Sequence, residues 1–402
     1  MYFSVLLTTT IAVLLALLPH SKAVDIPDPA PHDMPWKVAH NRSFLVDTSR
    51  KDPYDPTEDQ KVAYSVFLPV RTCSSTVDNL YMPDRTAKAS NLQFFGSENA
   101  NVFEKLHFKT CSGVTDKILL AKFPLIFFEP AAGTTRLLYS QLARQLSANG
   151  AIVVTVDHTY DASVVEFGDG SFTTKAGRSG LESFEINKPW DNDIATAVQA
   201  RTDDINAVIK ELQRLDTWKK LFPDIAFENE QLNTAKIHIV GHGLGGTVAT
   251  SMAAEDPRVY WVTNLSGSVP QVANDIESYV VFFGRENYSR NDDPAWVQAQ
   301  KHFTGLFAEW TYKKADQFDY SDLPLVSHLV DPKKEAKGLG KPYEIMKQGP
   351  ESTFNCLSCF LEAYFRDTVL PSWPIDLPGK EGRNELSTCM RYFTPAMLPY
   401  QA

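Results

Sequence analysis

The chain has 402 residues, 43% of them hydrophobic, which is enough to bury one large core or two modest ones. The formal net charge of −10 at pH 7 argues against a surface for nucleic acid or for an anionic membrane, because neither partner is attracted by negative charge. We therefore expect one catalytic-type domain with insertions.

The N-terminus carries an apolar stretch over residues 5–18, followed by Ser21-Lys22-Ala23 with small residues at the two positions that signal peptidase reads. The stretch is short for a bilayer span, and no other segment approaches 18 apolar residues. We predict a signal peptide over 1–23, a secreted (extracellular) protein and no transmembrane anchor. A segment rich in Pro and Asp, 24–60, is predicted to be an extended arm on the surface, and 61–402 to form the domain.

Sequons and cysteines fit passage through the secretory pathway. Asn-x-Ser triplets begin at Asn41, Asn264 and Asn287. Asn264 lies at the end of a predicted strand and is expected to be too buried, so glycosylation is predicted at Asn41 and Asn287.

The five cysteines suit two disulfides and one free thiol in an oxidising compartment. Cys73 and Cys111 form the preferred first pair, since both lie in the N-terminal third. Pairing among Cys356, Cys359 and Cys389 stays open. A metal or redox role for Cys356-x-x-Cys359 is less favoured, because no second such pair and no flanking His accompanies it.

Apolar strands and amphipathic helices alternate along the chain. The predicted strands are 64–73, 119–129, 151–158, 236–240, 260–264 and 278–284, and the predicted helices are 136–148, 191–215, 246–254 and 354–370. Residues 161–188 are predicted to be an insertion with a turn at Gly168-Asp169-Gly170. This alternation predicts a mostly parallel central sheet with helices on both faces.

Residues 236–254, KIHIVGHGLGGTVATSMAA, join an apolar strand to a small-residue helix through a glycine-rich turn. This pattern is typical of a nucleophile elbow, where small residues two before and two after the nucleophile let the chain turn sharply. Gly241, Gly245 and Gly246 satisfy that requirement, but Gly243 stands where a serine is expected. No acyl-enzyme can form on a residue without a hydroxyl.

Four blocks in order, within 124–170, 241–246, 264–268 and 320–326, resemble the fungal secreted branch of the platelet-activating factor acetylhydrolase family. The resemblance spans roughly residues 60–370. It implies an α/β-hydrolase fold and enzymes that cleave short or oxidised acyl chains from phospholipids and related esters.

By the same resemblance, the family's nucleophile, acid and base positions fall on Gly243, Ser266 and Gln317. All three catalytic side chains are absent from this chain. Because a serine, histidine and carboxylate act as one unit, their joint absence indicates lasting loss of serine-hydrolase chemistry.

An oxyanion-type corner depends on backbone rather than on side chains. The expected donors are the N–H of Leu244 and one from the loop 129–133, assigned to Ala131. Glu129 and Pro130 depart from the family pattern and put this second donor in doubt.

Two other interpretations start from the same region. Gly241 to Gly246 match G-x-G-x-x-G, but no acidic residue ends the next strand, so a dinucleotide site is less favoured. His242, His158 and Ser268 are possible polar site residues, although each is more simply structural. Ser266 or Ser268 as a displaced nucleophile lacks a base at a recognisable spacing. No metal-binding motif occurs, and we expect no cofactor.

The sequence thus favours an α/β-hydrolase scaffold that binds a small lipid or ester-like molecule without serine-hydrolase activity. Its role is either ligand binding or a non-hydrolytic cyclisation or isomerisation, in lipid or secondary metabolism. The alternative is an active carboxylic ester hydrolase, of the 1-alkyl-2-acetylglycerophosphocholine esterase type, that uses a displaced nucleophile.

Overall fold

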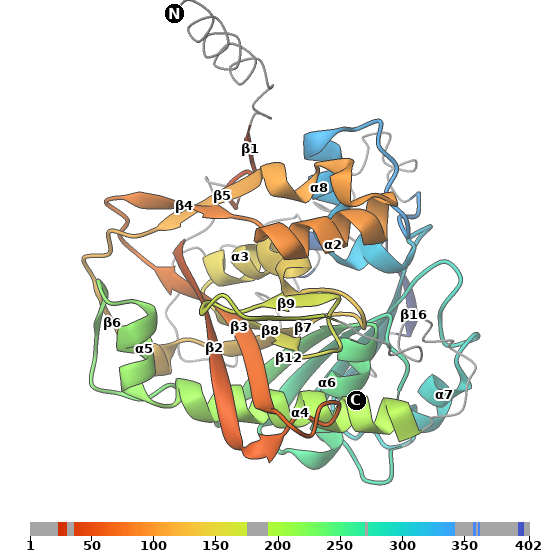
Figure 1. Ribbon diagram of the computed structural model, residues 1–402. Coiled ribbons are helices and arrows are strands. Elements are labelled where there is room, and N and C mark those ends of the chain that lie inside the picture. The colour runs from red at the N-terminus through yellow and green to blue at the C-terminus, as the bar shows by residue number, and fades with distance from the viewer. Residues whose placement is uncertain are drawn as a thin grey trace, which may run out of the picture.

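A nine-stranded sheet forms the centre of the molecule, with strand order β16-β15-β14-β13-β12-β7-β8-β3-β2 (Figure 1). The computed structural model describes residues 23–29, 36–174, 192–269, 272–341, 357–358, 361 and 393–397. The strands are β2 (Lys37–Lys51), β3 (Asp59–Val70), β7 (Leu125–Glu129), β8 (Ile152–His158), β12 (Ile237–His242), β13 (Val259–Leu265), β14 (Tyr279–Gly284), β15 (Phe307–Tyr312) and β16 (Phe393–Met397). The strands from β8 through β15 pair in parallel, whereas β3, β2 and β16 are antiparallel to their neighbours.

Helices cover both faces of this sheet, as predicted. Along β8, Val153 packs into one apolar cluster with α3 (Ser140–Ala148), while Val154 packs into a second cluster with α4 (Asn192–Leu212) and α6 (Leu244–Glu255). Successive side chains of a strand point to opposite faces, so each central strand must be apolar throughout. The carboxyl ends of the parallel strands meet at one edge, where α/β proteins place their sites.

All six predicted strands lie within the central sheet, and the first three predicted helices are present. Several boundaries differ from the prediction, two of them because of 3-10 turns. Leu120–Lys122 forms a short 3-10 turn, η3, so β7 begins only at Leu125; Arg136–Tyr139 forms a second one, η4, ahead of α3. The helix predicted over 354–370 lies outside the described residues except for three positions, and so do residues 1–22, Cys356, Cys359 and Cys389.

The prediction of a surface arm over 24–60 was wrong for much of its length. β2 pairs with β3 from Lys37 opposite Val70 to Asp47 opposite Gln60, so it is the edge strand of the central sheet. Edge strands tolerate polar and charged side chains because one side meets solvent. Because β2 contains many polar and charged residues, its sequence lacks the apolar pattern by which the other strands were predicted.

The predicted pairing of Cys73 with Cys111 is confirmed, with an S–S distance of 2.09 Å. Cys111 ends β5 (Leu106–Cys111), which lies between β1 (Val24–Asp25) and β4 (Thr76–Leu80) in a small separate sheet. The predicted turn at Gly168 is present between β9 (Val164–Glu166) and β10 (Phe172–Thr174).

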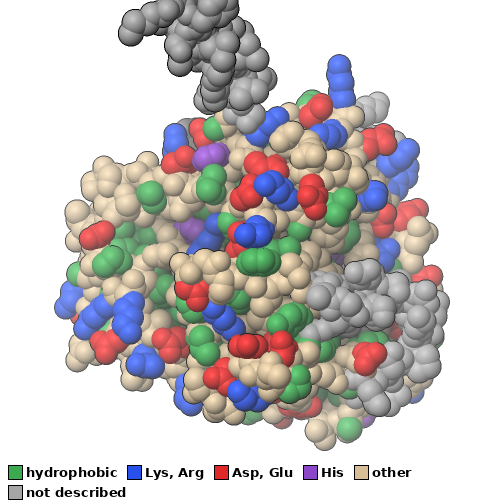
Figure 2. Space-filling view, in the orientation of Figure 1, with side chains coloured by type: hydrophobic (Ala, Val, Ile, Leu, Met, Phe, Trp, Pro, Cys, Tyr) green, Lys and Arg blue, Asp and Glu red, His purple; other side chains and the backbone are tan. Residues whose placement is uncertain are grey.

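Shorter elements complete the described chain. They are α2 (Asp84–Phe95), η1 (Glu98–Ala100), η2 (Phe103–Lys105), β6 (Lys117–Ile118), α5 (Leu215–Leu221), β11 (Ala226–Phe227), α7 (Pro294–Gln300), η5 (Gln317–Tyr320) and α8 (Leu323–Val330). On the face that Figure 2 shows, acidic and basic side chains are interspersed. Within the described part of the chain, no helix combines the length and hydropathy of a membrane span.

Candidate functional site

A sharp turn at Gly243 joins β12 to α6, as the elbow pattern predicted. Gly243 has φ 55° and ψ −121°, and its N–H donates to the carbonyl of Leu265 at 2.9 Å. This left-handed conformation is unfavourable for most residues with a Cβ atom. The turn therefore keeps the backbone conformation of a nucleophile elbow, which glycine adopts without strain.

The glycines that flank Gly243 are required by close backbone contacts. A Cβ atom at Gly241 would lie 2.1 Å from the carbonyl oxygen of Gly245, and one at Gly245 would lie 2.4 Å from that of Glu129. At Gly243 the nearest atom would be the Cβ of Ala131, at 3.3 Å. The flanking positions exclude any side chain, whereas the central position has room for a small one.

Replacing Gly245 by Ala is therefore expected to lower the free energy of unfolding by about 2–3 kcal/mol, because the methyl group overpacks against β7. Urea denaturation measures the change. Gly168→Ala is the matched control, since its Cβ would meet only Phe44, at 3.9 Å. Equal stability of the two variants would show that the elbow is not sterically constrained.

The structure brings Gly243, Ser266 and Gln317 to the same edge of the sheet. Ser266 follows β13 in a left-handed conformation with φ 61°, and its Oγ accepts a hydrogen bond from Arg285 Nε at 2.9 Å. Gln317 opens η5, where its N–H donates to the side chain of Asp316 at 2.7 Å. None of the three supplies a nucleophile paired with a base.

His242 is fully buried beside this edge, and it forms part of a chain of hydrogen bonds. The N–H of Ala131 donates to the Tyr139 hydroxyl at 3.2 Å, and that hydroxyl lies 2.8 Å from Nδ1 of His242. Burial first, and then the positive charge of Arg285, lower the pKa of His242 to about 3. His242 is therefore neutral at physiological pH.

The same contact corrects the predicted oxyanion corner. Ala131 was expected to offer a free N–H, but Tyr139 already accepts it. Tyr139 is the last residue of η4, and the centre of its ring lies 5.8 Å from that of the His242 ring, next to the elbow. Leu244 is the first residue of α6, so its backbone N–H has no acceptor within the helix. It is therefore a better donor toward a ligand than the N–H of Ala131, which already donates to Tyr139.

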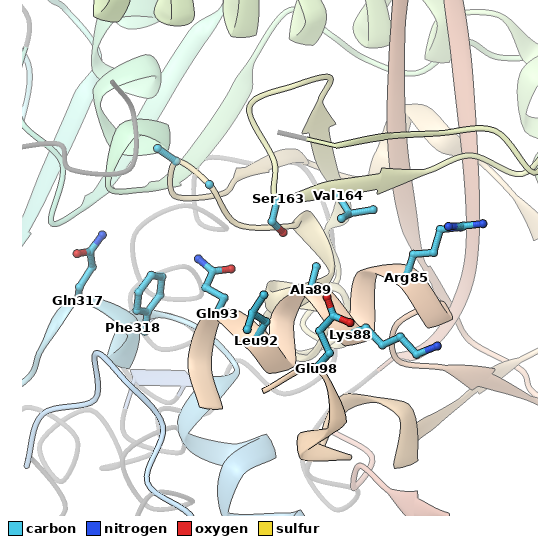
Figure 3. A pocket seen from close by; sticks show the side chains of 12 residues that line it. Arg85, Lys88, Ala89, Leu92, Gln93, Glu98, Ser163, Val164, Gln317 and Phe318 are labelled. Atoms are coloured by element: carbon cyan, nitrogen blue, oxygen red, sulfur yellow. The ribbon is translucent and has the colours of Figure 1, made fainter. Parts of the chain in front are cut away.

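A cavity of about 710 Å³ lies between the elbow edge and α2 (Figure 3). Its lining comes from α2, from Glu98 of η1, from the loop after β7, from the loop after β8 and the start of β9, and from η5. The lining residues are Arg85, Lys88, Ala89, Leu92, Gln93, Glu98, Ala132, Gly133, Ser163, Val164, Gln317 and Phe318. Of these, only Gln317 was predicted as a site residue.

The sequence did not predict α2, which supplies much of this wall. Its apolar face is interrupted by Thr86, Ser90 and Asn91, all buried, so helical periodicity is weak. The sequence does contain one indication of where this helix ends. Gly96 follows its last residue in a left-handed conformation, and glycine is common at that position after a helix.

The model of the platelet-activating factor acetylhydrolase, isoform II, family matches residues 53–269, more than half of the chain. The chain belongs to this family. It is 26% identical over 276 residues to the probable 1-alkyl-2-acetylglycerophosphocholine esterase of Arthroderma benhamiae, covering 64% of each chain. It is 28% identical over 227 residues to the platelet-activating factor acetylhydrolase of Bos taurus, covering 52% of this chain and 45% of the relative. The chain thus spans less than two thirds of the length of either relative.

Among solved structures, a ferulic acid esterase from Streptomyces cinnamoneus superposes with a TM-score of 0.69 at 19% identity. The match covers 93% of this chain and 100% of that one. Together with the family match, it confirms the predicted α/β-hydrolase fold.

In this acetylhydrolase-family chain, His158 belongs to a buried charge network rather than to the cavity. Its Nε2 lies 2.8 Å from Glu129 and its Nδ1 lies 2.9 Å from Asp204, so both ring nitrogens are occupied. Burial disfavours the imidazolium, but the charge of Glu129 and the hydrogen bonds to Asp204 and Glu129 outweigh burial and raise the pKa of His158 to about 9. His158 is thus a charged structural residue.

Arg201 of α4 completes this network beneath the elbow. Its Nε donates to Asp161 at 2.6 Å, and its Nη1 donates to the carbonyl of Pro130 at 2.7 Å. Nη1 of Arg201 also lies 3.7 Å from Glu129, so both Glu129 and the carbonyl of Pro130 are held to α4. The network fixes the loop behind the elbow.

Ser268 and the sequons also have clear placements. Ser268 Oγ donates to Asp293 at 2.6 Å, which holds it at the start of α7.

Among the sequon asparagines, Asn264 is buried, as expected, and its amide donates to the Gly246 carbonyl at 3.1 Å. The Asn41 amide donates to the Leu221 carbonyl, so the folded structure disfavours glycosylation there, whereas Asn287 is exposed.

Among the residues that the structure describes, no group of three or more His, Cys, Asp and Glu side chains is arranged to hold a metal ion.

Proposed function

We propose that this acetylhydrolase-family protein binds a lipid or ester-like molecule and lacks serine-hydrolase activity. The observation that carries the proposal is the elbow at Gly243, which has the backbone conformation of a nucleophile turn but no hydroxyl. An acyl-enzyme needs a nucleophilic oxygen at this point. The scaffold therefore retains the geometry without the reacting atom.

The other two substituted positions support the same conclusion. Ser266 presents its hydroxyl to Arg285 rather than a carboxylate to a histidine. Gln317 carries an amide, which cannot take a proton from a nucleophile at neutral pH. In the proposed interpretation, none of the three positions carries its catalytic side chain, so the serine-hydrolase reaction that the three side chains perform together is lost.

The cavity supports a retained binding role. At about 710 Å³ it lies in the range of small-molecule sites, and Ala132, Gly133, Gln317 and Phe318 bring it to the elbow edge. Half of its lining residues are apolar or glycine, Leu92 and Val164 among them, and the other half are polar or charged. This lining suits an acyl chain attached to a polar carbonyl group.

Fluorophosphonate labelling of the purified protein, read by intact and peptide mass, tests the loss of activity. We expect no adduct, because no serine stands at the elbow. The Arthroderma benhamiae relative, treated in parallel, controls for reagent quality. Calorimetry with a short-chain phospholipid then tests binding, which we expect without turnover. Absence of binding to any acyl ester would overturn the binding role.

A second candidate function is ester hydrolysis with a displaced nucleophile. The observation in its favour is that the curated relatives are named esterases or acetylhydrolases. The same labelling decides between the two: a stoichiometric adduct would identify the serine by peptide mass and replace the first proposal.

Secretion is part of the proposal. The apolar leader over 1–23 motivates it, and the Cys73–Cys111 disulfide agrees with it, since disulfides persist in oxidising compartments. The exposed sequon at Asn287 is the corresponding glycosylation site. Expression with the leader should give protein in the medium with a new N-terminus at Val24.

A further inference from the structure

The cavity has one end with charged side chains and one end with uncharged ones. The α2 residues that line it recur every three or four positions and so share one face of the helix; they are Arg85, Lys88, Ala89, Leu92 and Gln93. Figure 3 shows the two cationic side chains at the end of the cavity away from Gln317 and Phe318. A molecule that fills the cavity therefore meets cations at one end and the elbow edge at the other.

The two cations differ in how far their charges are compensated. Lys88 donates to Asp84 at 2.8 Å, and Glu98 lines the same end of the cavity. Arg85 forms no ion pair with any carboxylate that the structure describes, and its guanidinium carbon lies 4.1 Å from the centre of the Phe172 ring. An aromatic ring attracts a cation but does not neutralise its charge. Arg85 is thus an exposed cation of the cavity wall without an acidic partner.

Glu166 is the acidic residue of the strand next to Phe172, and it is bound elsewhere. It lies opposite Phe172 in the hairpin of β9 and β10. Its Oε2 accepts from both the backbone N–H and the hydroxyl of Thr86, each at 2.8 Å. Glu166 therefore binds the first turn of α2 rather than the guanidinium of Arg85.

Apolar surface and an amide donor continue from Arg85 toward the elbow. Leu92 is 49% exposed and Phe172 is 44% exposed, so both offer hydrocarbon to a ligand. Arg85 and Gln93 stand about 12 Å apart along the helix axis, roughly the length of an extended ten-carbon chain. Gln317, at the elbow end, is partly exposed, and a glutamine amide donates hydrogen bonds to a carbonyl.

We propose that the cavity binds a single-chain carboxylate, with its anionic group at Arg85 and an ester carbonyl near Gln317. A carboxylate accepts two N–H groups from one guanidinium. A phosphate monoester carries up to about two negative charges, which one unpaired cation does not balance and which Glu98 repels. This inference rests on the proposed binding function and deepens it, because it names the charge and length of the ligand.

Two probes of equal length test the charge. Monomethyl sebacate ends in a carboxylate, and the methyl ester of sebacamic acid ends in a neutral amide of the same shape. At neutral pH and low ionic strength, calorimetry on the purified protein is expected to show about fivefold tighter binding of the carboxylate, as for one exposed ion pair. The preference should nearly vanish in about 1 M NaCl, where charges are screened. Because the net charge of the chain is −10, the field of the whole protein would favour the amide instead.

Two arginine variants show whether the preference arises at Arg85. Arg85→Gln should abolish it and leave the affinity for the amide unchanged. Arg71→Gln is the matched control, because Arg71 is likewise exposed, with its guanidinium carbon 5.1 Å from the centre of the Trp36 ring, but does not line the cavity. This control should keep the full preference. Both arginines are exposed, so neither substitution should disturb the fold.

The outcomes separate this inference from the proposed binding function. Equal affinities, or tighter binding of the amide, would overturn the inference, and so would a preference that survives Arg85→Gln or is lost equally in Arg71→Gln. The binding function would stand in all these cases, since a probe binds. Binding of a short-chain phospholipid but of neither probe would also overturn the inference alone. Binding of no acyl ester of any kind would overturn both.

Discussion

A variant carrying Gly243→Ser, Ser266→Asp and Gln317→His is expected to react with fluorophosphonate at least about a thousandfold faster than the unsubstituted protein. Removing a nucleophile or base from a serine protease costs about a millionfold in kcat, so restoring all three groups should recover a large part of that activation. Peptide mass should locate the adduct on residue 243. The rate of labelling is the measured quantity.

The backbone is already arranged for this change. Gly243 holds the elbow conformation, and the Cβ of Ala131 at 3.3 Å needs to move only by a few tenths of an ångström for a serine to fit. At Ser266 the φ of 61° suits an aspartate, because Asp tolerates the left-handed region better than most residues. Arg285, which now donates to Ser266, keeps the new carboxylate ionised.

Incomplete variants provide the controls. Gly243→Ser alone should label slowly, since a serine without a base is a poor nucleophile. Gly243→Ser with Gln317→His should fall between the single and triple variants, because a carboxylate contributes less than the histidine it orients. Equal labelling of the single and triple variants would show that positions 266 and 317 do not cooperate with residue 243.

His158→Gln is expected to remove most of the pH dependence of stability between pH 7 and pH 9. The folded pKa of His158, about 9, lies above the usual value of 6.5, so folding favours the protonated ring. Its contribution is fully present below pH 6.5 and is lost as the pH rises through 9. The loss is of the order of 3 kcal/mol for a shift of this size.

Urea denaturation at several pH values between 7 and 9 measures this effect. Burial raises the pKa values of Asp319 and Asp322 to about 7, so both still titrate at the lower end of this range, but they do so equally in His158→Gln and in the unsubstituted protein. His242, whose pKa burial lowers to about 3, does not titrate in this range. His107→Gln is the control, because His107 pairs with Asp78 at the surface, where an ion pair contributes little. A steep loss of stability that persists in His158→Gln would assign it to another group.

Several features of this protein could be predicted from the sequence because they depend on neighbouring residues. The apolar strands of the sheet centre are recognisable since both of their sides are buried. The glycines around position 243 are recognisable because a local turn brings Gly241 and Gly245 into contact. The absence of a hydroxyl at position 243 follows from a single residue at the centre of that turn.

Other features depend on contacts between distant segments. β2 is too polar to be recognised until its pairing with β3 is known. His158 becomes a charged structural residue only because Glu129 and Asp204, from two other elements, reach its ring. Neither partner is a neighbour of His158 in the sequence, so its protonation could not be predicted.

The cavity is the clearest case of a feature decided by tertiary structure alone. Gln93 comes from α2, Ser163 from the loop after β8 and Gln317 from η5. Each residue is unremarkable in its own segment, and α2 itself has little helical periodicity. The sequence determined the fold class and the absence of a hydroxyl at position 243, since both follow from local patterns of burial and from the residue at the centre of the turn. The fold decided which residues line a common cavity, because that depends on how separate segments pack over the carboxyl edge of the sheet.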